Sequence, residues 1–342
     1  MTSHRVAVIA GDGIGPEVIE AAIPVLDRAA AKHGFALAWE RLPYSADHYL
    51  TTKETLPDHA FTHLRDDVDA IFLGAIGDPR VPGNEHARDI LLGLRFRLDL
   101  YINFRPVQLL HPSLTPLKAA ANIDFVIFRE NTEGVYLGRG RVTGDEYIAE
   151  EVNTARGVER IIRAAFAWAK AHGKTRVTMS DKANAVPAHK IWGQQFTAIA
   201  AEYPGIVAEH RFVDALAMEM VREPHRFQVI VTNNLYGDIL SDLGAGLVGG
   251  LGLAASANLH PGRAGLFEPV HGSAPPLAGL GVANPMAAIL TGALMVEQLG
   301  HEAAARDLER AVREALAGGV RTQDLGGNAS TAMAATAVSQ RL

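Results

Sequence analysis

The feature that most restricts how this chain folds is a regular alternation of short apolar runs with longer segments of helical periodicity. This alternation is typical of an α/β protein, in which helices cover a largely parallel sheet. The apolar runs predict buried strands at Arg5–Ala10, Ala70–Leu73, Phe125–Arg129, Val177–Ser180 and Phe227–Thr232. The periodic segments predict helices at Glu17–Lys32, Ala87–Leu100, Asn153–Lys170, Lys190–Tyr203, Gly237–Leu247, Pro285–Leu299 and His301–Leu316.

A length of 342 residues predicts two lobes, each large enough for a core of its own. The sequence contains no internal repeat and no low-complexity linker, so we expect the chain to cross between the lobes more than once. Residues 137–151 follow a predicted strand, are rich in Gly, Arg and Glu, and show little apolar periodicity. They predict a protruding arm or hairpin that serves as a functional loop or a partner contact.

Composition excludes several classes of function. The chain has no cysteine, which excludes iron–sulfur clusters, thiolate zinc sites and thiol nucleophiles. A net charge of −6 without a basic stripe argues against a nucleic-acid surface. Because the sequence shows neither a signal-like leader nor an apolar stretch of membrane-spanning length, we expect a cytoplasmic enzyme without a membrane contact.

Two acidic residues indicate a metal site. Asp238 and Asp242 are four residues apart, so a helix places both carboxylates on one face. Apolar neighbours would partly desolvate them and increase their repulsion, which a divalent cation relieves. Hard oxygen ligands without cysteine favour Mg²⁺ or Mn²⁺ over zinc. The alternative interpretation is a pair of solvated acids on a helix surface.

Two glycine clusters are less informative. Gly244, Gly246 and Gly249 match the spacing of a dinucleotide-binding loop but follow helical residues instead of a strand, so we interpret them as sites of close backbone packing. The run Gly11–Glu17 does lie between a strand and a helix but lacks that spacing. It indicates an anion or cofactor loop, or an ordinary tight turn.

Arginines and leucines suggest where an acidic substrate binds. On a helix at 87–100, the i, i+3, i+4 and i+7 positions share one face, which would place two leucines between arginines. These residues are Arg88, Leu91, Leu92 and Arg95. Arg105 and Arg129 each end a strand-like run, and their convergence with Arg95 would suit a dicarboxylic acid. For any single arginine, the alternative is a surface salt bridge.

Tyr136 and Lys182 are the candidate acid and base. Beside a divalent metal ion and several arginines, the pKa of Lys182 would be lowered and Tyr136 would become a competent proton donor. A packing or surface role is the alternative for each.

Five motifs together resemble the β-decarboxylating dehydrogenases, a family that includes the isocitrate, homoisocitrate, 3-isopropylmalate, D-malate and tartrate enzymes. The motifs occur in order over nearly the whole chain, at Gly11–Glu17, Arg129–Gly134, Asp181–Asn184, Asn234–Ile239 and Glu268–Pro275. The resemblance implies a non-Rossmann, isopropylmalate dehydrogenase-like α/β fold of two interleaved lobes. It implies a cofactor-binding lobe at residues 1–100 and 250–342, and a lobe for substrate, metal and dimerisation at 101–249, with a dimer arm near 137–151.

The resemblance also implies residue roles in a homodimer with shared active sites. Arg95, Arg105 and Arg129 would hold the carboxylates of a malate-type 2-hydroxy acid. Mg²⁺ or Mn²⁺ would bind Asp238 and Asp242 together with Asp214 from the partner, with K⁺ as a further candidate cation. Lys182, also from the partner, would be the base on the 2-hydroxyl, and Tyr136 would protonate the enol after CO₂ leaves. The nicotinamide cofactor would contact Glu268, His271, Gly272, Ser273, Ala274 and Asn284.

The preferred substrate depends on Leu91 and Leu92, which resemble the pocket for the isopropyl group of 3-isopropylmalate. Burying that group contributes about 1.5 to 3 kcal/mol, whereas a third carboxylate would find no partner there. We therefore expect conversion of 3-isopropylmalate to 4-methyl-2-oxopentanoate and CO₂, the reaction of leucine biosynthesis. The alternatives are D-malate or tartrate, then homoisocitrate or isocitrate; the form of Arg129–Gly134 resembles the isocitrate, tartrate and D-malate branches. A non-catalytic subunit of the same fold is the alternative of another class.

Two positions depart from the family pattern. Arg88 stands where isopropylmalate enzymes carry a glutamate near the nicotinamide, so it would bind a further anionic group. Pro276 stands where NAD-using members carry a ribose-binding aspartate, and proline offers no hydrogen bond there. Because the Lys and Tyr of NADP-using isocitrate enzymes are absent as well, we expect NAD, with NADP as the alternative.

Overall fold

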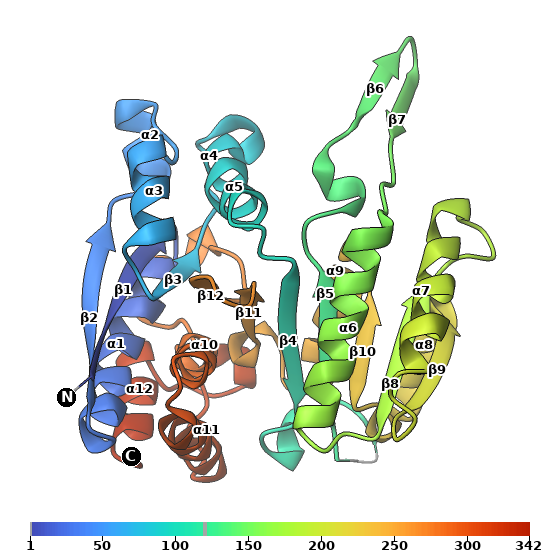
Figure 1. The fold of residues 1–342 in the computed structure, drawn as a ribbon. Coiled ribbons are helices and arrows are strands. Elements are labelled where there is room, and N and C mark those ends of the chain that lie inside the picture. Colours follow the sequence, from blue (N-terminus) through green and yellow to red (C-terminus); the bar gives the residue numbers. More distant parts are fainter. Residues whose placement is uncertain (1, 119–121) are drawn as a thin grey trace. The chain divides into compact units, whose positions relative to one another are not determined.

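The computed structural model describes residues 2–118 and 122–342. It is a mixed α/β fold that divides into two compact units (Figure 1). Unit 1 comprises Met1–Leu100, Leu110–Thr115 and Gly249–Leu342, and unit 2 comprises Tyr101–Leu109 and Pro116–Val248. Across the described ranges, no helix is both long and apolar enough to cross a membrane.

Unit 1 contains a mostly parallel set of strands in which only the β11–β12 pairing is antiparallel. The predicted strands at residues 5–10 and 70–73 are confirmed as β1 and β3. Every residue of β3 is buried, as expected for a strand covered on both faces. In spatial order the strands are β2 (Phe35–Leu42), β1 (Thr2–Gly11), β3 (Ala70–Ala75), β12 (Gly265–Pro269) and β11 (Ala255–Leu259).

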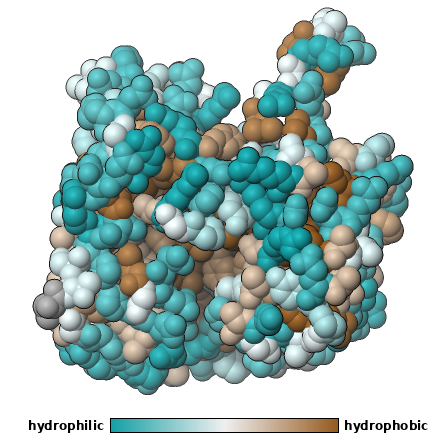
Figure 2. Space-filling view, viewed as in Figure 1, coloured by the Kyte–Doolittle hydropathy of each residue, from teal (hydrophilic) through white to brown (hydrophobic). Residues whose placement is uncertain are grey.

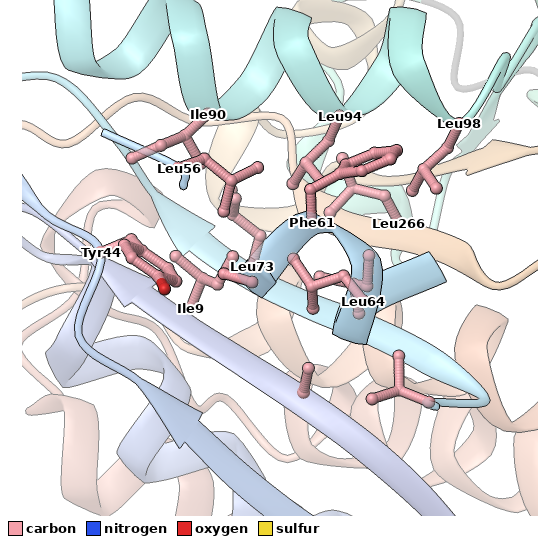
Figure 3. Packing of buried hydrophobic residues seen from close by; sticks show 14 of the residues in the cluster. Ile9, Tyr44, Leu56, Phe61, Leu64, Leu73, Ile90, Leu94, Leu98 and Leu266 are labelled. Carbon is pink, nitrogen blue, oxygen red and sulfur yellow. The ribbon is translucent and has the colours of Figure 1, made fainter. Parts of the chain in front are cut away.

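The helices of unit 1 cover these strands and bury a continuous apolar core. Ile90, Leu94 and Leu98 lie at four-residue spacing and face this core, where they meet Phe61 and Leu64 (Figure 3). The helices are α1 (Gly15–Lys32), α2 (Ala46–Thr52), α3 (Asp58–Asp66), α4 (Glu85–Ala87), α5 (Gly93–Arg97), α10 (Met286–Gln298), α11 (Glu302–Ala317) and α12 (Thr331–Ser339).

The helix predicted at 87–100 is not one continuous α-helix. A π-helical turn, Arg88–Leu92, separates α4 from α5. A π turn is wider than an α turn, so the α-helical spacing that was expected to align four side chains does not apply across it. Arg88 is exposed while Arg95 is buried, so the two arginines differ in their access to solvent.

Unit 2 has a second set of strands, antiparallel between β4 and β5 and parallel elsewhere. The strands predicted at residues 125–129, 177–180 and 227–232 are confirmed as β5, β8 and β10. In spatial order the strands are β4 (Ile102–Gln108), β5 (Asp124–Glu130), β10 (Val229–Thr232), β8 (Arg176–Asp181) and β9 (Val207–Phe212). The helices are α6 (Ala155–Ala171), α7 (Lys190–Ala200), α8 (Val213–Arg222) and α9 (Asn234–Leu247).

Alternation along β4 and β5 decides which side chains meet which helices. Phe104 and Phe128 pack around Trp168 of α6. Phe125 and Ile127 point the other way, into a core shared with α8 and α9. Because side chains alternate along a strand, the odd-numbered residues of both strands face α9.

The predicted arm is confirmed as a β-hairpin. Its strands, β6 (Gly140–Thr143) and β7 (Glu146–Ala149), pair with each other and belong to no other sheet. The hairpin extends away from the helices and strands of unit 2 (Figure 1). Val142 and Tyr147 are exposed on it, and Figure 2 shows hydrophobic surface on this arm.

The predicted close packing of the glycine run at 244–249 is confirmed at Gly244 and Gly249 and is wrong at Gly246, where nothing lies within 4 Å of an added Cβ. Gly244 lies inside α9, and a Cβ atom there would stand 2.8 Å from Cγ2 of Val107. The missing side chain therefore lets α9 approach β4 closely. Gly249 has φ +121°, a backbone conformation that favours glycine.

Candidate active site

Two buried arginines of unit 2 point at one carboxylate. In the β4–β5 ladder, Arg105 pairs with Ile127 and Arg129 pairs with Asn103, so both odd-numbered arginines face α9. Their side chains are 8% and 1% exposed. Arg129 Nη1 donates to Asp238 Oδ1, and Arg105 Nη1 lies 3.3 Å from the same oxygen.

Asp238 also accepts a hydrogen bond from the candidate acid. The Tyr136 hydroxyl donates to Asp238 Oδ2 at 2.6 Å. One turn further along α9, Asp242 Oδ1 lies 3.6 Å from Arg105 Nη1. Burial raises the pKa of the Asp242 carboxyl; Arg105 opposes the rise, Asp238 adds to it and Arg129 opposes it. The structure thus brings together five predicted residues: Arg105, Arg129, Tyr136, Asp238 and Asp242.

Three residues without a predicted role hold the arginines in place. Asn234 Oδ1 accepts from Arg129 Nε at 2.9 Å and from Nη2 at 2.7 Å. Ser241 Oγ accepts from Arg105 Nη1 at 2.5 Å. A Cβ atom at Gly237 would stand 2.5 Å from the Arg129 side chain, so glycine is needed for Arg129 to lie against α9. Asn234 and Gly237 lie in the motif Asn234–Ile239, which contributed to the family resemblance. That motif was the sequence signal that could have indicated their role.

The candidate base is paired with the third candidate metal ligand. Lys182 Nζ donates to Asp214 Oδ1 at 2.6 Å, and this bond lowers the pKa of Asp214. Asp214 lies in the first turn of α8, and its side chain is 68% exposed. Residues 2–118 and 122–342 contain no group of three acidic or histidine side chains arranged to hold a metal ion. Within one chain, Asp214 therefore does not complete a cluster with Asp238 and Asp242.

The donor set on α9 nevertheless fits a divalent cation. Asp238 and Asp242 present carboxylate oxygens from one helix face, and hard oxygens are the ligands that Mg²⁺ and Mn²⁺ prefer. The guanidinium groups of Arg105 and Arg129 lie at the same place, and a guanidinium group can bind a carboxylate through two parallel hydrogen bonds. The arrangement suits a cation together with an anionic acid, with further oxygen ligands coming from that acid or from a second chain.

Unit 1 holds the other predicted substrate residues. Arg95 Nη2 donates to Glu268 Oε1 at 2.6 Å, and both side chains are buried. Asn258 Nδ2 donates to the same oxygen at 2.9 Å, which completes a buried polar cluster. A predicted substrate residue and a predicted cofactor residue thus meet directly. Leu91 and Leu92 lie half-buried in the π turn just before Arg95.

Two predicted cofactor residues line a pocket in unit 1. Its volume is about 360 Å³, and its lining is Ile14, Gly252, His271, Leu277, Val282, Ala283, Asn284, Gln323 and Asp324. His271 Nε2 is buried there without a hydrogen-bond partner among the described residues. Burial lowers the pKa of His271 and thereby favours the neutral ring. Asn284 Nδ2 donates to Asp324 Oδ2 at 3.1 Å, which fixes the amide in the wall.

The loop after His271 is held by backbone contacts. Ser273 Oγ donates to the Gly77 carbonyl at 2.5 Å, and the Ser273 carbonyl accepts from the Ile14 N–H at 2.8 Å. Ala274 has φ +38°, which is unfavourable for a residue with a Cβ atom and is typical of functional loops. Gly272, the remaining residue predicted to contact the cofactor from this loop, is exposed.

The run Gly11–Glu17 forms a tight turn against this loop. A Cβ atom at Gly13, which has φ +58°, would collide with the Ser273 carbonyl. Asp12 is buried and accepts from the Ala46 N–H at 2.6 Å, the Gly77 N–H at 2.8 Å and His86 Nε2 at 2.8 Å. The Asp12 carboxylate is therefore satisfied within the protein, and the turn contacts the predicted cofactor loop through its backbone.

A further acid, Glu130, is buried beside Arg129 at the end of β5. Its carboxyl accepts from the Thr132 N–H at 2.9 Å, the Thr132 hydroxyl at 2.7 Å and the Glu133 N–H at 2.7 Å. Burial outweighs these bonds and raises the pKa of Glu130 to about 7.

Comparison with known proteins agrees with this geometry. A family model described as isocitrate/isopropylmalate dehydrogenase matches residues 5–340. A 3-isopropylmalate dehydrogenase of Beutenbergia cavernae is 46% identical over 87% of this chain and 88% of its own length. One of Thermobifida fusca is 44% identical over 93% of this chain and 94% of its own. The crystal structure of isocitrate dehydrogenase from Methylococcus capsulatus superposes with a TM-score of 0.90 at 39% identity, covering 99% of both chains.

The fold and the family match identify a decarboxylating dehydrogenase of the α/β class. The chain belongs to the isocitrate/isopropylmalate dehydrogenase family.

Replacing Gly237 by alanine tests whether a residue without a side chain is needed there to position Arg129. The added Cβ displaces the Arg129 side chain, so we expect kcat/KM for the acid substrate to fall at least about tenfold, or about 1.4 kcal/mol. Gly246→Ala is the matched control, because it lies on the same helix and nothing stands within 4 Å of its added Cβ. Equal activity of the two variants contradicts the role given to Gly237.

Glu130→Gln tests the buried acid through the pH dependence of stability. The folded chain keeps this proton up to pH about 7, whereas the unfolded chain releases it near 4.5, so the folded state binds more protons between these values. The stability of wild type relative to the variant should therefore fall by about 3 kcal/mol as pH rises from 4.5 to 7.5. Urea unfolding at a series of pH values measures this, and parallel profiles contradict it.

Proposed function

We propose that the protein catalyses the NAD-linked, divalent metal-dependent oxidative decarboxylation of 3-isopropylmalate to 4-methyl-2-oxopentanoate and CO₂. The convergence of Arg105, Arg129 and Tyr136 on Asp238 carries this proposal. It combines carboxylate recognition, metal-ligating oxygens and a proton donor within one unit. The curated relatives of Beutenbergia cavernae and Thermobifida fusca, both named 3-isopropylmalate dehydrogenase, support the same reaction. In this proposal the enzyme serves leucine biosynthesis in the cytoplasm.

The proposed roles use the geometry of each group. Arg105 and Arg129, with Arg95, hold the two malate carboxylates, and Lys182 removes the proton of the 2-hydroxyl. Tyr136 donates its proton to the enol carbon after CO₂ has left, and its bond to Asp238 orients the hydroxyl. Asp238 and Asp242, with Asp214 from a second copy of the chain, hold Mg²⁺ or Mn²⁺. When bound, the metal would supply Lewis-acid stabilisation of negative charge on the substrate, and the nicotinamide cofactor would supply the hydride acceptor.

The pocket in unit 1 supports NAD over NADP. Its described lining contains an acid, Asp324, and neither lysine nor arginine. A 2′-phosphate placed there would meet negative charge and no guanidinium or ammonium partner, which disfavours NADP. His271 and Asn284 are the proposed polar contacts in this wall, with the Gly272–Ala274 loop beside them, and Glu268 acts from its pair with Arg95.

The choice of acid rests on Leu91 and Leu92. Both are half-buried, Leu91 packs against the core cluster of unit 1, and Arg95 follows in the next turn. An isopropyl group against the two leucines gains apolar burial, whereas the third carboxylate of isocitrate would be desolvated without a partner. D-malate or tartrate is the second candidate. Each ranks lower because the smaller acid would leave Leu91 and Leu92 without an apolar contact. Exposed Arg88 remains available for a further anionic group, and K⁺ is a candidate accessory cation.

A homodimer is proposed because unit 2 exposes apolar side chains around its acids. Met218 and Val221 on α8 and Ile239 on α9 are exposed on the helices that carry the three candidate metal ligands. Large apolar residues left in solvent on adjacent helices indicate an interface. The arm, with exposed Val142 and Tyr147, is a second contact for the same partner.

A substrate panel with leucine variants tests the specificity. With Mn²⁺ and K⁺, wild type should give the highest kcat/KM with 3-isopropylmalate and NAD. Leu91→Ala and Leu92→Ala should each lower kcat/KM for 3-isopropylmalate by about tenfold while leaving D-malate nearly unchanged, because only the former loses apolar contact. A tenfold preference of wild type for D-malate, tartrate or isocitrate contradicts the assignment.

Mixed dimers test the shared site. Lys182→Met and Asp238→Asn should each abolish turnover in homodimers. If one site takes Lys182 from one chain and Asp238 from the other, the heterodimer of the two variants keeps one intact site and about half of wild-type activity. Differently tagged subunits allow the heterodimer to be purified and assayed for NADH formation. A heterodimer as inactive as its parents places both residues in one chain and contradicts the proposal.

A further inference from the structure

The start of α1 contacts two walls of the pocket in unit 1. Ile14 lines the pocket, and its N–H holds the Ser273 carbonyl, which belongs to the loop that follows His271. Three residues later, Glu17 reaches the segment 281–283, which leads to Asn284 in the opposite part of the lining. The motif Gly11–Glu17 thus contacts both segments at once.

Glu17 holds its segment through backbone groups. Its Oε1 accepts from the Ala283 N–H at 3.0 Å, and its Oε2 accepts from the Gly281 N–H at 3.3 Å. Thr331, at the start of α12, adds to this arrangement from the other side. Its hydroxyl contacts the Glu17 carboxylate and lies 2.6 Å from the Ala283 carbonyl, and its N–H donates to the Gly281 carbonyl at 2.9 Å.

These contacts matter because residues 281–283 belong to neither a helix nor a strand. Regular ladders do not fix them, so their N–H groups need other partners. A carboxylate that accepts from two such groups supplies charge-assisted hydrogen bonds that fix the segment in one conformation. Val282 and Ala283 line the pocket themselves, so that conformation determines the shape of this wall.

We propose that Glu17, supported by Thr331, is a positioning residue for the nicotinamide cofactor. Its carboxylate fixes residues 281–283 in the conformation that forms the pocket wall, and this sets the affinity for the cofactor without a contact between Glu17 and the cofactor. The inference rests on the proposed function in one respect, the binding of NAD in this pocket.

Glu17→Gln tests the proposal, because it replaces one accepting oxygen by an NH₂ group that faces a backbone N–H. We expect the dissociation constant for NADH, measured by fluorescence titration without the acid substrate, to rise about tenfold. At saturating NAD, kcat and the KM for the acid should stay within about twofold of wild type. Thr331→Val, which keeps the shape and removes the hydroxyl, should also weaken NADH binding.

Glu20→Gln is the matched control. Glu20 lies on the same helix, is exposed and pairs with Arg41, and its substitution should leave the NADH dissociation constant unchanged. If the Glu17→Gln variant binds NADH as tightly as this control, the inference is overturned, even if its melting temperature falls. If circular dichroism shows that Glu17→Gln does not fold, the same comparison is made with Thr331→Val, and unchanged NADH binding by that variant overturns the inference. A wild-type protein that binds neither NADH nor NADPH refutes the proposed function instead, so the two failures are distinguishable.

Discussion

The arrangement of unit 2 depends on one electrostatic constraint, the need to balance two buried guanidinium groups. Arg105 and Arg129 lie among apolar strand residues, where an unpaired charge is costly. Asp238 balances them from the facing helix, and this pairing requires a strand register that turns both arginines toward α9 and a glycine at 237 that leaves room for Arg129. The same acids and arginines are the groups proposed to bind a cation and a dicarboxylic acid, so the structural constraint and the proposed chemistry coincide.

Unit 1 uses carboxylates differently. Glu268 neutralises buried Arg95, whereas Asp12 and Glu17 accept hydrogen bonds mainly from the backbone of loops. Backbone groups in irregular segments need partners as much as those in ladders do, and a carboxylate satisfies several at once. The segment 281–283, which contributes to the pocket lining, is thereby fixed by the side chain of Glu17, and the loop after His271 by the backbone N–H of Ile14. A motif without dinucleotide-binding spacing can therefore support the proposed cofactor site.

The sequence predicted strands that are continuous apolar runs better than interrupted strands and irregular turns. Strands such as β3 and β10 are almost entirely apolar and were predicted. The edge strand β9 carries three consecutive polar residues, and the buried strands β11 and β12 are interrupted by polar residues, Gly or Pro; all three were missed. The π turn at Arg88–Leu92 was also missed, because periodicity assumes α-helical spacing. Asp238 and Asp242 were found from their i, i+4 spacing. Asn234, Ser241 and Asn258 were given no role, since what they contact depends on strand register, and Lys182 with Asp214 meets the remaining acids only in the proposed dimer.

The central claim is that a divalent cation bound by the α9 acids is required for the reaction of the acid held by the arginines. Turnover of 3-isopropylmalate by protein stripped of divalent ions with a chelator, and then supplied with Mn²⁺, tests it most directly. We expect no NADH formation by the stripped protein and full recovery with Mn²⁺, with no recovery for Asp238→Asn. Undiminished turnover by the stripped wild-type protein would contradict it.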